Sequence, residues 1–69
     1  MDRMLAEEFM GLLQQINGSL NSASQFTERL TDKAERDAIR RPLGTLMEIV
    51  YLELMRPITK QYPDLDPDA

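Results

Sequence analysis

Residues 46 to 55 read LMEIVYLELM, and all but the two glutamates are apolar or aromatic. On a helix, at about 100° per residue, these side chains point in nearly every direction. A helix that is apolar all round must be covered on more than one face. A chain of 69 residues has only one other long helix to offer, so this segment predicts that a second copy of the protein supplies the missing cover.

The first half of the chain is apolar on one side only. Apolar residues recur there at steps of four and three, and Ser19 occupies the one polar step. They are Leu5, Phe9, Leu12, Ile16, Ala23, Phe26 and Leu30. Leu13 and Leu20 widen this stripe. The spacing is typical of an amphipathic helix, so we expect a helix over about residues 2–30.

Asn17-Gly18 is a strong turn dipeptide inside this segment and leaves an alternative open. In that alternative, two helices cover about residues 2–16 and 20–30. The apolar stripe, however, passes from Ile16 to Leu20 without a change of phase, and a turn would usually reset it. We therefore favour one continuous helix.

A second helix is expected over about residues 33–61. Asp32 can cap its first turn, with Glu35 three residues later as the acidic partner in a capping box. Pro42 has no N–H to donate to the carbonyl four residues earlier, which predicts a kink at that position. Residues 62–69 are acidic and punctuated by proline, and we expect them to form an extended tail.

The very short connection at residues 31–32 implies that the two helices are antiparallel neighbours. The predicted fold class is all-α, with residues 1–61 forming an antiparallel helical hairpin. Because the second helix needs cover beyond its own hairpin partner, we expect two hairpins to pair as a homodimeric four-helix bundle.

The second helix is expected to use one face toward its own hairpin and another toward a partner. Its core face is predicted to hold Leu43, Leu46, Met47, Val50, Leu54 and Ile58. The apolar residues outside that face are Ile49, Leu52 and Met55. We assign the dimer or partner interface to Leu46, Ile49, Val50, Leu52, Leu54 and Met55.

The composition indicates a small globular protein that needs support beyond its own core. Apolar residues make up 42% of the chain and charged residues 29%, which is a globular balance. A chain this short buries only about 60% of its unfolded surface. It has no cysteine for a disulfide and no histidine, the commonest metal ligand. Oligomerisation is the support that remains.

The sequence also predicts no enzyme, no cofactor and no metal. Glu48 and Glu53 are the carboxylates nearest to the apolar centre, but they lie five residues apart and point to different sides of a helix. A di-iron site in a helical bundle would in addition require histidine. Serine and threonine hydroxyls likewise have no histidine to activate them, and the three glycines are isolated rather than gathered in a phosphate-binding loop.

We expect a cytoplasmic protein without a membrane partner. The residues from Met1 to Met4 do not open a signal peptide. The longest apolar stretch is interrupted by two glutamates, which would be costly inside a bilayer.

A basic patch near the start of the second helix is the candidate nucleic-acid contact. Its arginines are Arg36, Arg40 and Arg41, with Lys33 beside them. In length and topology the predicted hairpin dimer resembles the Rop family of plasmid-encoded RNA-binding regulators. That resemblance implies a nucleic-acid-binding regulator as the alternative function.

The charge pattern favours a different partner. Acidic residues are interleaved with the basic patch at helical spacing, no aromatic residue is placed there to stack on bases, and the net charge is −4. The favoured function is therefore a non-enzymatic homodimeric module for protein–protein interaction, open to another protein partner as well as to its own copy.

Overall fold

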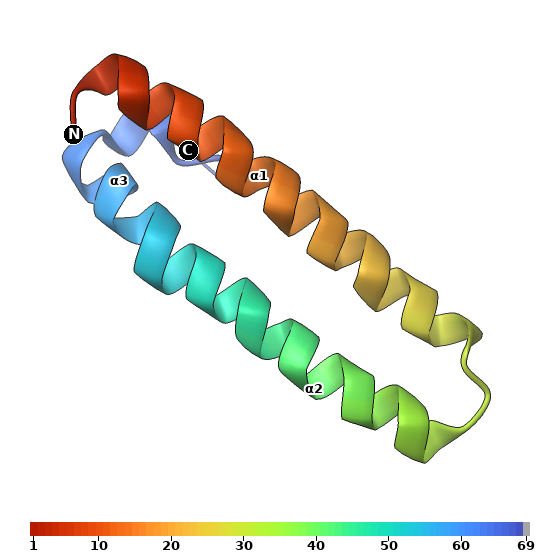
Figure 1. The fold of residues 1–69 in the computed structure, drawn as a ribbon. Coiled ribbons are helices and arrows are strands. Elements are labelled where there is room, and N and C mark those ends of the chain that lie inside the picture. The colour runs from red at the N-terminus through yellow and green to blue at the C-terminus, as the bar shows by residue number, and fades with distance from the viewer. Residues whose placement is uncertain (69) are drawn as a thin grey trace.

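The computed structural model describes residues 1–68, which form a helical hairpin (Figure 1). Two long helical segments run side by side in opposite directions, and the two ends of the chain lie together away from the connecting loop. The hairpin measures 46 × 18 × 15 Å. Its radius of gyration of 14.5 Å exceeds the value of about 11 Å for a compact chain of this length. The molecule is therefore a layer one helix thick, as the sequence predicts for the single chain.

The first segment consists of α1, Arg3–Phe26, continued by a 3₁₀ turn at Thr27–Arg29. The Asp2 carboxylate caps α1 by accepting a hydrogen bond of 2.9 Å from the backbone N–H of Leu5. Helical structure passes through Asn17-Gly18 without a break, so the prediction of one continuous helix is confirmed.

The second segment consists of α2, Lys33–Ile49, a π-helical turn at Val50–Met55, and α3, Arg56–Gln61. The Asp32 carboxylate caps α2 by accepting a hydrogen bond of 3.0 Å from the backbone N–H of Ala34. The helix continues through Pro42, and the departure from α geometry lies further on, in the π turn. This placement differs from the predicted kink at Pro42.

The π turn widens the helix just before a second proline. The backbone N–H of Arg56 donates to the carbonyl of Tyr51, five residues earlier, which is the π pattern. Pro57 cannot donate, and its ring crowds the carbonyl four residues earlier in a regular α-helix. We infer that the wider turn accommodates this crowding.

The extra residue in the π turn changes which side chains face α1. Met55 is only 3% exposed and Leu54 is 38% exposed. The prediction that Leu54 belongs to the core and Met55 lies outside it is therefore wrong, because it assumed an unbroken α-helical phase. Leu46 was also predicted for the core and is exposed.

The apolar core occupies the end of the hairpin that carries the chain termini. It contains Ala6, Met10, Leu13, Val50, Met55 and Ile58. The loop end is held by polar contacts instead. The buried Thr27 hydroxyl donates to the carbonyl of Ser24 at 2.6 Å and accepts from Nε of Arg40 at 2.7 Å.

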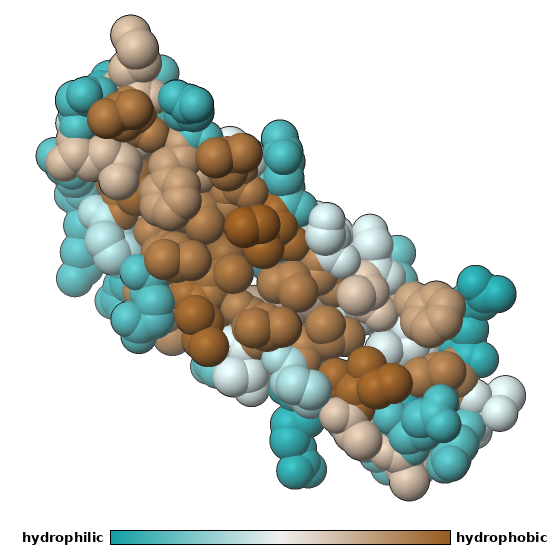
Figure 2. Space-filling view, viewed as in Figure 1, coloured by the Kyte–Doolittle hydropathy of each residue, from teal (hydrophilic) through white to brown (hydrophobic). Residues whose placement is uncertain are grey.

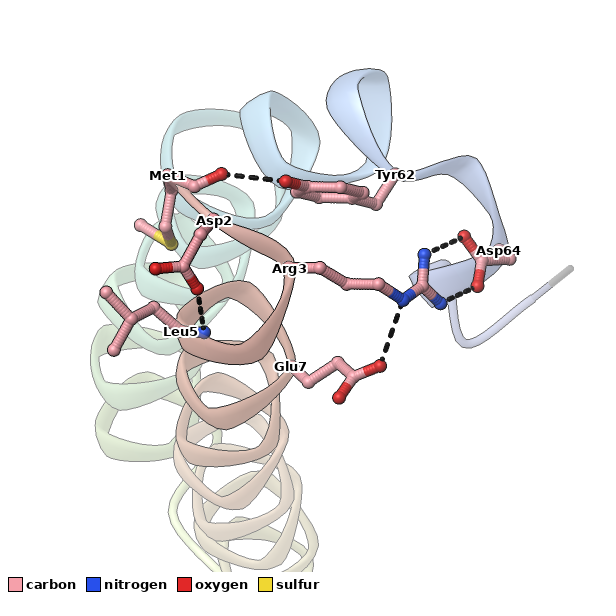
Figure 3. A network of polar contacts seen from close by, with 7 residues as sticks. All are labelled: Met1, Asp2, Arg3, Leu5, Glu7, Tyr62 and Asp64. Carbon is pink, nitrogen blue, oxygen red and sulfur yellow. Dashed lines mark hydrogen bonds and ion pairs between the residues drawn. The ribbon is translucent and has the colours of Figure 1, made fainter.

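The chain termini are joined by contacts between α1 and the tail (Figure 3). The Arg3 guanidinium donates to both carboxylate oxygens of Asp64 and, at 3.1 Å, to Glu7. The Tyr62 hydroxyl donates to the carbonyl of Met1 at 2.8 Å, and the Arg3 guanidinium lies 5.6 Å from the centre of the Tyr62 ring.

The tail therefore differs from the predicted extended segment over residues 62–69. Pro63–Leu65 forms a 3₁₀ turn, and the half-buried Leu65 packs against the core. Residue 69 of the predicted tail lies outside the described residues. The hydrogen bonds from Arg3 lower the pKa of the Asp64 carboxyl below its ordinary value.

Candidate interaction surface

The first segment carries two neighbouring stripes of side chains, each with steps of four and three residues. The inner stripe extends over α1 and the residue that follows this helix. It faces the second segment and contains no exposed residue. Its members are Ala6, Met10, Leu13, Asn17, Leu20, Ser24 and Thr27. The outer stripe lies one residue earlier at every step and comprises Leu5, Phe9, Leu12, Ile16, Ser19, Ala23 and Phe26.

The outer stripe is the more apolar of the two, yet most of it is open to solvent. Leu5, Leu12 and Ile16 are 54%, 51% and 48% exposed. The inner stripe includes Asn17, Ser24 and Thr27, none of which is exposed. The hairpin thus leaves uncovered the side chains that the sequence pattern identifies as the apolar side of the first helix.

The second segment has the same arrangement. Its inner apolar residues are Leu43, Met47, Val50, Met55 and Ile58, none of which is exposed. The residue before each of them is exposed, which gives an outer stripe of Pro42, Leu46, Ile49, Leu54 and Pro57. The step across the π turn is five residues, so the turn keeps both stripes in phase beyond it.

The two outer stripes lie on the same face of the hairpin. Successive side chains are about 100° apart around a helix. In two antiparallel neighbours, the side chains one residue before the contact residues therefore point toward the same face of the pair. Figure 2 shows this face as a broad apolar surface that covers both helices. We call it the open face, defined by the two outer stripes.

The structure places the predicted interface residues in two groups. Leu46, Ile49, Leu52 and Leu54 are exposed, and Ile49 and Leu52 line a shallow groove of about 270 Å³ with Glu48 and Glu53. Val50 and Met55 are buried inside the hairpin. These two assignments are corrected, because both side chains pack against the first helix and do not reach the open face.

The contribution of the first helix to this surface was missed by sequence reasoning. The sequence pattern predicts that the outer stripe of α1 packs inside the hairpin, and it assigns the partner surface to the second helix alone. The available signal was the second stripe beside it, marked by Leu13 and Leu20. Two adjacent stripes on one helix indicate two neighbouring partners rather than one.

The predicted nucleic-acid contact is partly used within the hairpin. Arg40 donates to Thr27, and Nη1 of Arg36 donates to the carbonyl of Leu30 at 3.3 Å. Lys33 forms an ion pair of 2.6 Å with Asp37, and this hydrogen bond lowers the pKa of the Asp37 carboxyl. Arg41 lies farther out, beside a groove of about 460 Å³ that Pro42, Thr45 and Leu46 also line.

Neither a metal site nor a membrane span is found in the described part of the chain. No three side chains of the metal-binding types His, Cys, Asp or Glu come together within residues 1–68. None of the helices described there combines the length and the apolar character needed to cross a membrane. Comparisons with protein-family models, with curated proteins and with solved structures find no match to this chain.

Proposed function

We propose that this chain is a non-enzymatic helical protein that acts by association, and that its first partner is a second copy of itself. Two hairpins would pack through their open faces to form a four-helix bundle. The observation that supports this most strongly is the exposure of the outer stripe of α1. Apolar side chains at steps of four and three form the seam of a helical bundle, and here that seam has no cover.

The dimensions of the open face fit a dimer interface. A face of 46 by 18 Å has an area on the order of 800 Å², which is about what one partner contributes to a standard interface. Monomeric proteins rarely leave so many large apolar side chains uncovered on one face. Covering it would also supply the apolar burial that so thin a hairpin lacks.

A second copy is a suitable occupant because the open face can match itself. The same patch meets itself across the twofold axis of a symmetric dimer, and both helices of the hairpin present an apolar outer stripe on this face. Residues 9–27 contain no charged side chain. An identical helix can therefore approach closely without the cost of burying an unpaired charge.

Leu12→Glu tests the proposal by placing a charge at the centre of the outer stripe. In sedimentation equilibrium at micromolar concentration, we expect the unaltered chain to have about twice its mass of 8.0 kDa. The variant should sediment as a monomer, because a buried, unpaired carboxylate is strongly unfavourable.

Gln14→Glu is the matched control, since it adds the same charge two residues away on an exposed side outside both stripes. This control should remain a dimer. A monomeric unaltered chain would contradict the proposal, and so would a Leu12→Glu variant that remains a dimer.

A further inference from the structure

We infer that the two copies pack with their loop ends at opposite ends of the bundle, so that α1 lies antiparallel on α1 of the second copy. This inference rests on the proposed dimer and specifies its geometry. Two observations carry it independently: the distribution of side-chain size along the outer stripe of α1, and the distribution of charge along the hairpin.

Side-chain size is unevenly distributed along the outer stripe of α1. The stripe begins with the large residues Leu5 and Phe9, continues toward the loop with the small residues Ser19 and Ala23, and ends at Phe26. If two α1 helices cross near residue 14 in opposite directions, Leu5 lies beside Ala23 of the second copy and Phe9 beside its Ser19. Large residues then face small ones at these four positions, on either side of a central contact between Leu12 and Ile16, which is how helical cores fill space.

The groove along α1 is in the right place for this packing. It has a volume of about 560 Å³, and its lining runs from Phe9 past Ser19 to Leu20. The small Ser19 side chain leaves room there. In the antiparallel arrangement, Phe9 of the second copy enters the groove at this point.

The opposite arrangement packs less evenly. If the loop ends lay together, α1 would pack on the second segment of the other copy. Leu5 and Phe9 of both α1 helices would then lie at one end of the bundle, and Ser19 and Ala23 of both copies nearer the other. Ser19 would then face the second segment of the other copy instead of Phe9, and the pairing of large with small side chains between the two α1 helices would be lost.

Charge is distributed unevenly between the two ends of the hairpin. The terminal end, residues 1–8 and 53–68, carries seven acidic and three basic side chains, a net charge of −4. The loop end, residues 28–41, carries four acidic and five basic side chains, a net charge of +1. Opposed loop ends place the acidic end of each copy beside the basic end of the other, whereas aligned loop ends place the two acidic ends together.

The absence of charge in residues 9–27 is compatible with the same arrangement. With α1 packed antiparallel on α1, the acidic first turns of one helix, with Asp2, Glu7 and Glu8, lie over the uncharged later turns of the other. No carboxylates of the two α1 helices are then forced together, which avoids repulsion between like charges.

A distance between two loop labels tests the arrangement directly. The chain has no cysteine, so Thr31→Cys introduces a single attachment site for a nitroxide label in the exposed loop. Opposed loop ends predict a label separation of about 50 Å, from a rise of 1.5 Å per residue over roughly 17 residues on each side of the crossing point. Aligned loop ends predict less than about 25 Å, since neighbouring helices lie 8–10 Å apart.

The outcomes of pulsed dipolar spectroscopy separate this inference from the proposed function. A separation near 50 Å supports the antiparallel arrangement. A separation below 25 Å overturns that arrangement and leaves the dimer intact. If the labels show no dipolar coupling and the labelled protein sediments as a monomer, both the arrangement and the proposed dimer fail.

A size exchange within the seam provides a second test that needs no label. Phe9→Ser and Ser19→Phe should each raise the dimer dissociation constant by about 10-fold or more, because each disturbs two symmetry-related contacts. The double variant restores a large residue opposite a small one and should recover most of the lost affinity. Additive losses in the double variant would overturn the predicted pairing of these two positions.

Discussion

In the first segment, the outer stripe is more apolar than the inner stripe and yet less buried. The inner stripe is covered by the second segment although three of its seven members are polar, and the outer stripe is open although it holds most of the large apolar side chains. In a self-sufficient domain the most apolar side of a helix faces the core. This difference supports the proposed dimer, in which a second copy covers the open face.

Truncating adjacent leucines on the two stripes gives the largest expected contrast. Leu13 is 1% exposed, so Leu13→Ala should lower the free energy of unfolding by about 3 kcal/mol at any protein concentration. If the proposed dimer forms, Leu12→Ala should destabilise the protein mainly at protein concentrations where it is dimeric, because the neighbours of Leu12 would belong to the second copy. Urea unfolding at two widely separated protein concentrations distinguishes these effects. If the loss of stability depended on protein concentration equally in both variants, the two stripes would not differ in the way we propose.

The polar part of the inner stripe gives a smaller contrast. Thr27→Val keeps the shape of a fully buried side chain but removes the hydroxyl that bonds to Ser24 and Arg40. We expect a loss of about 1 kcal/mol in unfolding free energy, measured by chemical denaturation. Arg40→Gln is the companion variant. If the Thr27→Val, Arg40→Gln double variant loses no more unfolding free energy than Thr27→Val alone, the two side chains act through one hydrogen bond.

The smallest expected effect concerns the contacts between the chain termini. Because Arg3 lowers the pKa of Asp64, this carboxylate stabilises the fold above its unfolded pKa of about 3.9. The contribution is lost as the pH falls through the lower pKa of the folded state. Asp64→Asn should therefore slightly lower the melting temperature at pH 7 and have no effect near pH 2. A difference that persists unchanged at pH 2 would show that the ion pair is not its cause.

Much of the fold follows from local sequence signals. Asp2 and Asp32 precede helical stretches and cap them, and the apolar phase across Asn17-Gly18 outweighs the turn propensity of that pair. The short loop between the helices predicts their antiparallel arrangement. These features depend on neighbouring residues, and such signals can be read without knowledge of the tertiary structure.

Other features depend on contacts that the sequence does not reveal locally. Arg3 and Asp64 are 61 residues apart, and either could have paired with another surface charge. Met55 lies in the core in place of the predicted Leu54, because the π turn shifts every later side chain by one position. Which of two apolar stripes faces α2 depends on tertiary packing, because both stripes have the same spacing.

The π turn makes the second helix one residue longer than a regular α-helical path between the same two core positions would require. Val50 and Met55 enclose four residues where an α-helix would need three. A chain that lost one residue within this turn could revert to ordinary α geometry while the segment after it kept its place. Because the wider turn accommodates Pro57, we expect such a deletion to be tolerated best when Pro57 is also replaced by a residue that can donate a backbone hydrogen bond.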